Sequence, residues 1–525
     1  MKNRSTTDGV HNSSVWSGTT AMPNFAPLRE DIDADVCIVG GGISGLTTAY
    51  LLVLAGKSVV LLNDGPLAGG ATELTTAHLS NAIDERYFEI ERLHGADGAR
   101  RTAESHTAAI DRIESIVDDE KIDCDFERVD GYLFLSPDDE NEVLDRELAA
   151  ARRAGLRDVE KLDRAPLQSF ETGPCLHFPS QAQFHPLKYL AALANAIQRS
   201  GGRIFTETRA DRIEGGTPAR ITAGNRVVTA RAVVVATNTP VNDLVVMHTK
   251  QAAYMTYVVA ARLPHGAATK ALCWDTGDPY HYVRIQSPMA DEAGDGDLLI
   301  VGGEDHKTGQ ADDAVERHAR LETWARTQFP MMGRIEFAWA GQVMKTIDGL
   351  AFIGRNPLDK ENVYIVTGDS GMGMTHGTIA GMLLTDLILG RGNPWTTLYD
   401  PSRKTLRATG RFVGELLNVA AQYADWLTPG DVKSESEIAK DSGAVVRRGL
   451  TKVAVYRDAE GALHEFSAVC SHLGGIVQWN SGEKTWDCPC HGSRFDKNGA
   501  VVNGPANKNL SPIEVKVQHA EENQT

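Results

Sequence analysis

A glycine-rich turn between an apolar run and a helical segment constrains the fold of this chain most strongly. Residues 35–39 read DVCIV and residues 40–45 read GGGISG. A short, β-branched apolar run is typical of a buried parallel strand. In the GxGxxG pattern the first glycine permits a tight turn, the second lets the backbone approach a pyrophosphate, and the third lets the helix pack on the strand. The positive end of that helix favours phosphate. The pattern predicts an α/β dinucleotide-binding fold.

A second apolar run, residues 58–62, ends where a ribose-binding carboxylate is expected, about 20 residues beyond the glycine turn. Asn63 stands at that position and Asp64 follows it. Because an asparagine can still hydrogen-bond a hydroxyl group, we expect a weakened ribose contact.

Two short clusters of cysteine and histidine lie near the C-terminus, at residues 470–472 (CSH) and 488–491 (CPCH). They place two thiolates and two neutral imidazoles on two loops, so that one iron of a [2Fe-2S] cluster can take both sulfurs and the other both nitrogens. The same donors also permit structural zinc. The candidate metal ligands are Cys470, His472, Cys488 and His491.

The surrounding residues resemble the Rieske [2Fe-2S] domain from about residue 430 to residue 520. The segments CSHLGG and CPCHGS and the proline loop at residues 504–506 carry the resemblance, which favours a two-iron cluster over zinc. Gly475 stands where respiratory members have a cysteine that pairs with the position of Cys490, so we expect Cys490 to be an unpaired thiol.

The same resemblance bears on the redox potential. Ser493 is kept as a possible hydrogen bond to a bridging sulfide, whereas Phe495 replaces a tyrosine whose hydroxyl reaches a cysteine sulfur in high-potential members. Fewer hydrogen bonds to sulfur lower the potential. We expect a midpoint in the lower half of the window of about −150 to +300 mV.

Three further segments resemble FAD enzymes of the D-amino-acid oxidase and glycine oxidase superfamily: residues 68–78, 232–238 and 365–377. They match the loop along the isoalloxazine, the buried strand that returns to the FAD, and the closing FAD motif. Leu74 occupies the position of a flavin-linking histidine found in some relatives, so we expect FAD to be bound non-covalently. The predicted FAD contacts are Gly40, Gly42, Ile43, Ser44, Gly45, Asn63, Asp64, Gly70, Ala71, Thr72, Thr75, Thr76, Ala236, Thr237, Asn238, Gly371, Met372, Gly373, Met374 and Thr375.

The resemblance implies an α/β (α+β) Rossmann-type FAD domain, an inserted α+β substrate domain and a small all-β Rieske domain. The expected divisions are an N-terminal arm at 1–33, FAD binding at 34–95, 196–245 and 340–400, a substrate domain at 96–195 and 246–339, a connecting helix and linker at 401–429, and the Rieske domain at 430–520.

The substrate site is less well defined. In amino-acid-oxidising members an arginine clamps the substrate carboxylate, and Val343 stands at its position here. Arg284, beside Tyr282 on a predicted strand, could replace it, although an exposed or phosphate-bound arginine is an equal alternative. A histidine near a flavin motif is more often structural than a base. The candidate catalytic residues are Tyr282, Arg284 and His78.

Composition excludes several partners. A formal charge of −17 and a pI near 5.4 argue against nucleic acid and anionic membrane. No apolar run approaches the ~18 residues of a spanning helix. Residues 1–33 are polar without a hydrophobic signal core, and read as a loose arm. Seven cysteines, an odd number spread over the chain, fit a reducing cytoplasm.

We therefore expect an FAD- and [2Fe-2S]-dependent oxidoreductase. It would oxidise an amine or an imino- or amino-acid-like small molecule by hydride transfer, and pass electrons singly to a one-electron carrier protein or a quinone. One alternative is the reverse current, in which the cluster feeds the flavin of a reductase or monooxygenase. Another is a non-enzymatic electron-transfer or redox-sensing module.

Overall fold

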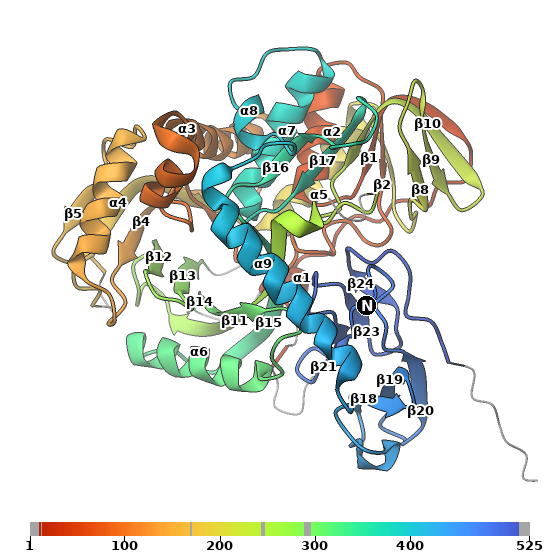
Figure 1. Cartoon of the computed structure of the whole chain (residues 1–525). Helices are drawn as coiled ribbons and strands as arrows, with labels where there is room; N and C mark the ends of the chain where they lie inside the picture. Colours follow the sequence, from red (N-terminus) through yellow and green to blue (C-terminus); the bar gives the residue numbers. More distant parts are fainter. Residues whose placement is uncertain (1–9, 12, 168–170, 243–246, 288–295, 514–525) are drawn as a thin grey trace, which may run out of the picture. The chain divides into compact units, whose positions relative to one another are not determined.

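The computed structural model describes residues 10, 11, 13–167, 171–242, 247–287 and 296–513 (Figure 1). The chain forms two compact units. The first unit contains residues 1–307 and 315–415, and the second contains residues 308–314 and 416–525. Among the described residues, no helix combines the length and the apolar character needed to cross a membrane.

An eight-stranded sheet forms the core of the first unit. Strand β1 (Ile32–Val39) lies between β10 (Arg226–Val235) and β2 (Val59–Leu62) and runs parallel to both. The apolar run of β1 is buried, as its composition predicts. The remaining strands are β7 (Arg203–Phe205), β17 (Val363–Thr367), the antiparallel β16 (Phe352–Arg355), β8 (Arg212–Glu214) and β9 (Ala219–Ala223).

Two helices that follow glycine turns pack closely together beside this sheet (Figure 1). They are α2 (Ile43–Leu54) and α7 (Gly373–Ile388). A Cβ at Gly381 would lie 2.5 Å from Thr47 Cγ2, so only glycine allows this approach. The other helices of the unit are α1 (Val15–Thr19), α3 (Tyr87–Glu120), α4 (Asn141–Arg153), α5 (Pro186–Arg199), α6 (Ala314–Gln328) and α8 (Thr396–Tyr399).

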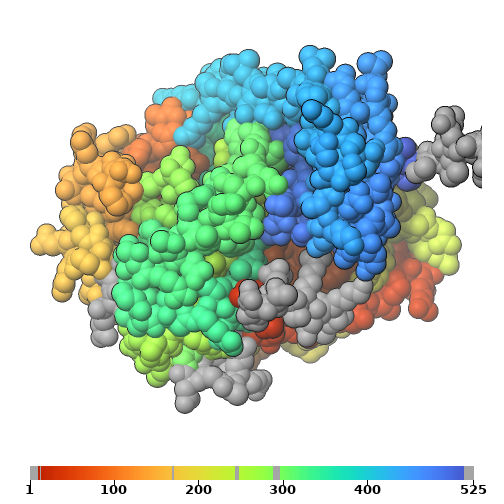
Figure 2. Space-filling model, turned by 90° about the horizontal axis from the view of Figure 1, so that it is seen from below, coloured from red at the N-terminus to blue at the C-terminus, as the bar shows by residue number. Residues whose placement is uncertain are grey.

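A second, nine-stranded sheet belongs to the same unit. Its three longest strands lie side by side, with β15 (Ile335–Thr346) at the edge of the sheet, then β11 (Gln251–Pro264) and β14 (Gly296–Lys307). The others are β13 (His281–Gln286), β12 (Leu272–Asp275), β4 (Glu127–Phe134), β6 (Cys175–Gln183), β3 (His78–Leu79) and β5 (Glu160–Leu162). Helix α6 buries only a narrow stripe that includes Leu321 and Ala325, and its other side chains form a broad green area in Figure 2.

The N-terminal arm corrects a prediction. Residues 1–33 were expected to be loose because they are polar, but Trp16 is completely buried and its Nε1 donates to the Thr75 carbonyl at 2.5 Å. The Thr206 hydroxyl donates to the Phe25 carbonyl at 2.5 Å. A few contacts therefore fix the described part of this segment, residues 10, 11 and 13–33, despite its average composition.

The second unit is rich in short antiparallel strands. One sheet contains β18 (Ser442–Arg448), β19 (Thr451–Arg457) and β20 (Leu463–Ser467). The other contains β21 (Gln478–Asn480), β22 (Thr485–Asp487), β23 (Arg494–Asp496) and β24 (Val501–Asn503). The small all-β domain that the sequence predicts is therefore present.

The connection into this unit differs from the expected one. Helix α9 (Thr409–Gln422) occupies only part of the connecting helix and linker expected at 401–429, and a 3-10 turn (Tyr423–Leu427) follows it. The chain just beyond residue 429 packs on β18, because Asp431 N donates to the Val445 carbonyl at 2.8 Å and Val445 N donates to Asp431 Oδ2 at 2.7 Å.

Candidate redox sites

The glycine turn leaves β1 and enters α2 at the carboxyl end of the parallel strands. Gly40 has φ +110°, and a Cβ there would overlap the Ala236 carbonyl oxygen. A Cβ at Gly45 would overlap the Gly40 carbonyl oxygen. Because Ile43 is the first residue of α2, the early amide groups of the helix lie at the turn, where phosphate charge is stabilised. The geometry fits the predicted pyrophosphate site.

Asn63 takes a role that the sequence did not suggest. Its Oδ1 accepts from Gly41 N at 2.8 Å, and its Nδ2 donates to the carbonyls of Gly65 and Pro66, both at 2.9 Å. Both amide hydrogens are thus used within the protein, and the side chain braces the glycine turn. Asp64 is exposed next to it.

The two other strand ends bring their motifs to the same edge of the sheet. Ala236 N donates to the Val39 carbonyl at 2.8 Å, so the segment after β10 starts beside the end of β1. Ala236, Thr237 and Asn238 remain partly exposed. Ligands of open α/β sheets bind at this edge.

In the closing motif after β17, two glycines are at least partly exposed and larger residues beside them are buried. Gly371 is exposed with φ +82°, and Gly373 is partly exposed at the start of α7. Met372, Met374 and Thr375 are buried. The Thr375 hydroxyl lies 2.9 Å from His106 Nδ1 and so faces the core. The Thr375 side chain is therefore engaged within the protein, and its contact with FAD stays a prediction.

The loop predicted to pass along the isoalloxazine is held by its backbone. Trp339 Nε1 donates to the Leu74 carbonyl at 2.9 Å, and Trp16 holds Thr75 as described above. Thr72 Oγ1 accepts from Ile43 N at 3.3 Å, which ties the loop to α2. Gly70 is exposed, Ala71 and Thr75 are partly exposed, and Thr76 is buried. The two tryptophans belong to no motif, so this role could not be predicted from the sequence.

Arg284 is not available as a carboxylate clamp. It is fully buried, and its Nη1 donates to the carbonyls of Thr76 and Ala77, both at 3.0 Å, and of Phe184 at 3.2 Å. Its Nη2 donates to Gln286 Oε1. Arg284 instead stabilises residues 68–78, which we call the flavin loop, because its guanidinium donates hydrogen bonds to backbone carbonyls of this loop.

His78 and Tyr282 lie together, with ring centroids 5.7 Å apart. His78 Nδ1 lies 3.1 Å from Thr76 Oγ1 and Nε2 lies 3.3 Å from the Val283 carbonyl. Burial and the nearby Arg284 charge lower the pKa of His78 to about 3, so the ring is neutral at physiological pH. Burial raises the pKa of Tyr282, whose hydroxyl lies 2.9 Å from Thr256 Oγ1. Both can hydrogen-bond a ligand, but neither is placed as a strong base.

A polar cluster that the sequence did not single out lies on the nine-stranded sheet. Lys345 Nζ is 3.3 Å from Asp305 Oδ2, 4.8 Å from the Tyr254 ring centroid and 5.7 Å from the Tyr280 ring centroid. Burial opposes the charge of Lys345, but Asp305 and Asp84 hold its pKa above the usual value. We call these five residues, Asp84, Tyr254, Tyr280, Asp305 and Lys345, the lysine cluster.

The lysine cluster adjoins the predicted flavin site. A Cβ at Gly371 would overlap the Asp84 carboxylate, and the Tyr280 hydroxyl donates to Asp84 Oδ2 at 3.2 Å. Burial raises the pKa of Asp84 to about 6. Because side chains alternate along a strand, Lys345 shares a face of β15 with Val343, where the clamp is expected. This two-residue spacing is the signal that could have pointed to Lys345.

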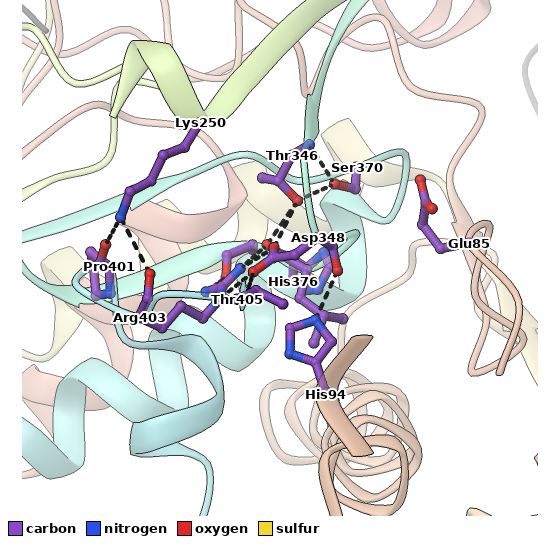
Figure 3. Close-up of polar contacts among 12 residues, drawn as sticks. Glu85, His94, Lys250, Thr346, Asp348, Ser370, His376, Pro401, Arg403 and Thr405 are labelled. Carbon is purple, nitrogen blue, oxygen red and sulfur yellow. Dashed lines mark hydrogen bonds and ion pairs between the residues drawn. The ribbon is translucent and has the colours of Figure 1, made fainter. Parts of the chain in front are cut away.

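A buried ion pair fixes the chain next to the closing motif (Figure 3). Arg403 binds Asp348 through two hydrogen bonds, Nε to Oδ2 at 2.8 Å and Nη2 to Oδ1 at 2.7 Å. The Thr405 hydroxyl donates to Asp348 Oδ2 at 2.6 Å, and His94 Nε2 lies 2.8 Å from the Asp348 carbonyl. Burial alone would raise the pKa of Asp348, but Arg403 holds it well below its usual value.

Two further contacts in Figure 3 extend this anchor. Lys250 Nζ donates to the Pro401 carbonyl at 2.9 Å. Thr346 N donates to Ser370 Oγ at 3.1 Å, which ties the end of β15 to the closing motif. The segment before α9 is therefore an anchored loop rather than the start of the predicted helix.

In the second unit, two turns present the predicted cluster ligands. Gly474 N donates to the Cys470 carbonyl at 3.0 Å in the first turn, and Gly492 N donates to the Cys488 carbonyl at 2.9 Å in the second. The Cys470 and Cys488 sulfurs are neighbours. The His472 and His491 rings are also neighbours, with centroids 5.0 Å apart. One thiol pair and one imidazole pair fit a cluster with one sulfur-bound and one nitrogen-bound iron.

The surroundings of the ligands bear on two sequence observations. A Cβ at Gly475 would lie 2.6 Å from Cys490 Sγ and 3.1 Å from Cys488 Sγ, so residue 475 does lie against Cys490. None of the seven cysteines, all of which lie in the described residues, is in a disulfide. Ser493 Oγ accepts from Ala506 N at 3.0 Å and interacts with the Cys470 sulfur, so it links the proline loop to a ligand.

Comparison with known families agrees with both sites. The family model for FAD dependent oxidoreductases matches residues 35–387, and the model for the Rieske [2Fe-2S] domain matches residues 428–516. The predicted cofactors, FAD and a [2Fe-2S] cluster rather than zinc, are thereby confirmed.

Individual relatives cover the chain to different extents. YhfW of Bacillus subtilis (strain 168), named as a Rieske 2Fe-2S iron-sulfur protein, is 34% identical over 95% of this chain and 97% of its own length. Gamma-glutamylputrescine oxidoreductase of Escherichia coli (strain K12) is 29% identical over 72% of this chain and 89% of its own. The crystal structure of glycine oxidase from Geobacillus kaustophilus matches 71% of this chain and 99% of its own, with a TM-score of 0.58 and 17% identity. This last likeness supports the predicted fold class.

Proposed function

Because this chain belongs to the FAD-dependent oxidoreductase family and carries a Rieske domain, we propose that it couples oxidation of a small amine to one-electron delivery to an external acceptor. FAD supplies a two-electron acceptor for hydride, and the cluster supplies a one-electron carrier. The observation that carries the proposal is the combination, in one chain, of a glycine-only pyrophosphate turn and two loops with paired thiols and paired imidazoles.

The side chains near the flavin motifs favour an amine that lacks a carboxylate next to the reacting nitrogen. Position 343 holds valine, Arg284 is occupied by backbone carbonyls, and Lys345 is paired with Asp305. No cation in this group is left to bind a carboxylate. The E. coli relative is named for an amine substrate, gamma-glutamylputrescine, which supports the same class.

Asp84 is our candidate for the group that takes a proton from the substrate. Amines are cationic at neutral pH and must lose a proton before hydride transfer. A carboxyl group with a pKa of about 6 is mostly ionised at pH 7 and is still basic enough to accept that proton. The Tyr280 hydroxyl, which donates to Asp84, would hold the carboxylate in place. Tyr282 and the neutral His78 would orient the substrate by hydrogen bonds.

The acceptor and the compartment are further parts of the proposal. A Rieske cluster carries one electron at a time, so we propose a one-electron carrier protein or a quinone as the partner. None of the seven cysteines is in a disulfide, and all seven lie in the described residues, which supports a reducing compartment such as the cytoplasm.

The substrate class can be tested by anaerobic reduction of the purified holoprotein. The flavin band should bleach with primary or secondary amines, and much more slowly with the matching α-amino acids. An obligatory requirement for an external electron donor would instead support the reverse current, and flavin that no amine bleaches would refute the proposal.

A further inference from the structure

The first cluster loop, residues 470–475, receives two hydrogen bonds from the turn that follows α9. The Tyr423 hydroxyl donates to the Leu473 carbonyl at 2.7 Å, and Trp426 Nε1 donates to the Gly474 carbonyl at 3.0 Å. These are aromatic side chains at the surface of the unit, and Trp426 is 36% exposed. Each of them donates a hydrogen bond to a carbonyl of the loop that contains the predicted ligands Cys470 and His472.

The hydrogen bond from Tyr423 strengthens the hydrogen bond that closes the first cluster loop. The Leu473 carbonyl and the Gly474 N–H belong to one peptide group, and that N–H donates to the Cys470 carbonyl at 3.0 Å. A donor on the carbonyl polarises the peptide group and strengthens its N–H as a donor. Tyr423 therefore stabilises the turn that presents Cys470 and His472.

The second cluster loop, residues 488–493, is held by a segment from a distant part of the sequence. Residues 308–314 follow β14 in the chain but belong to the second unit. Gln310 Nε2 donates to the Pro489 carbonyl at 3.3 Å. Gly309 has φ +72°, and a Cβ there would lie 2.9 Å from Pro489 N and 3.1 Å from the Cys488 carbonyl carbon. The backbone of the segment thus packs directly on the loop.

The two holding segments are also joined to each other and to the rest of the unit. Gln310 Nε2 lies 2.8 Å from Asn418 Oδ1 on α9. Asp312 accepts hydrogen bonds at 2.7 Å from both the amide and the hydroxyl of Ser481. Gln310, Tyr423 and Trp426 all lie outside residues 428–516, the part that matches the Rieske family model.

We propose that Gln310, Tyr423 and Trp426 are positioning residues for the [2Fe-2S] cluster. They hold both ligand loops, so the retention of the cluster and its potential depend on segments outside the Rieske domain. Loss of a donor on a loop carbonyl leaves that carbonyl's negative end uncompensated near the cluster. This disfavours the extra electron of the reduced state and lowers the midpoint potential.

The test uses the full-length holoprotein with the single variants Tyr423→Phe, Trp426→Phe and Gln310→Leu. Tyr456→Phe is a matched control, because its hydroxyl donates to Asp441 Oδ1 at 2.6 Å in the same unit without touching a cluster loop. The measurements are the rate of cluster loss to an iron chelator, the midpoint potential, and the electron paramagnetic resonance spectrum of the reduced cluster.

We expect Tyr423→Phe and Trp426→Phe to lose the cluster about fivefold faster, the effect of one hydrogen bond on a rate. Gln310→Leu should behave similarly. Each variant should show a lower midpoint potential and shifted resonance, with an unchanged FAD content. The proposal is overturned if Tyr423→Phe and Trp426→Phe match the unsubstituted protein, or if Tyr456→Phe changes retention and potential as much as they do. A variant that binds FAD normally but never acquires the cluster supports it.

Discussion

The two redox sites differ in how far apart in sequence their residues lie. The four cluster ligands fall between residues 470 and 491, whereas the predicted FAD contacts extend from residue 40 to residue 375. Yet both sites depend on distant supports. Arg284 and Trp16 hold the flavin loop, and Gln310 and Tyr423 hold the cluster loops. Even a compact ligand motif therefore receives contacts from residues distant in the sequence.

The largest expected effect separates the two sites. Gly45→Val should abolish FAD binding, because any Cβ at residue 45 overlaps the Gly40 carbonyl oxygen, while the cluster loops of the second unit are untouched. FAD and iron should be measured per protein chain. Gly392→Val is the control, because a Cβ there meets nothing within 4 Å. Loss of iron together with FAD would show that the two sites do not form independently.

The next effect concerns the anchor beside the closing FAD motif. Asp348→Asn leaves Arg403 as an unpaired buried charge, which should cost about 3–5 kcal/mol of unfolding free energy. Denaturant unfolding followed by flavin release measures it. The exposed pair of Arg326 and Glu322 gives the control, because Glu322→Gln should change stability by less than about 0.5 kcal/mol.

The pair of Asp348 and Arg403 also predicts that the free energy of unfolding falls at acidic pH. Since Arg403 holds the pKa of Asp348 below that of an unfolded aspartate, its stabilisation is present above about pH 4 and is lost as the pH falls through the folded-state value. The Asn variant should lack this part of the acid dependence. An unchanged acid limb would show that Asp348 does not dominate it.

The proposed proton acceptor gives an intermediate effect. Asp84→Asn should slow amine-dependent flavin reduction by about 100-fold, in line with the loss of a general base. In the unsubstituted protein the rate should rise as the pH passes about 6, because Asp84 becomes ionised there. Rapid-mixing kinetics across this range measure both. The control is Glu85→Gln, because Glu85 is a neighbouring acid that pairs with Arg411. This variant should keep the rise in the rate of flavin reduction near pH 6.

The smallest effect lies at the cluster. Gly475→Ala places a Cβ 2.6 Å from Cys490 Sγ and should speed cluster loss by about tenfold, because overpacking destabilises. Adding Cys490→Ala should restore slow loss, since it removes the sulfur that the new methyl group meets. Chelator-driven bleaching gives the rates, and a double variant as unstable as Gly475→Ala would show that this contact is not the cause.

The sequence was informative where one residue type has one physical use. Gly40 and Gly45 admit no side chain, and Cys470 and His472 carry donors that suit iron, so each could be assigned from spacing. It failed where tertiary contacts assign the role. Arg284 was a candidate to bind a substrate carboxylate, but in the structure its guanidinium donates to three backbone carbonyls.

Average composition also misled. The polar N-terminal segment was expected to be loose, but Trp16 is buried and bonds to the Thr75 carbonyl, and Phe25 contacts Thr206. Lys345 and Gln310 belong to no motif, and only the folding of β15 and of the segment after β14 brings them to their partners. Such residues require the structure, because their neighbours are distant in the sequence.

Rapid freeze-quench electron paramagnetic resonance after anaerobic mixing with an amine can show whether electrons pass from the flavin to the cluster. We predict that the signal of the reduced [2Fe-2S] cluster grows after the flavin band bleaches and does so within the time of one turnover. A cluster that stays oxidised after the amine has reduced the flavin would rule out this transfer.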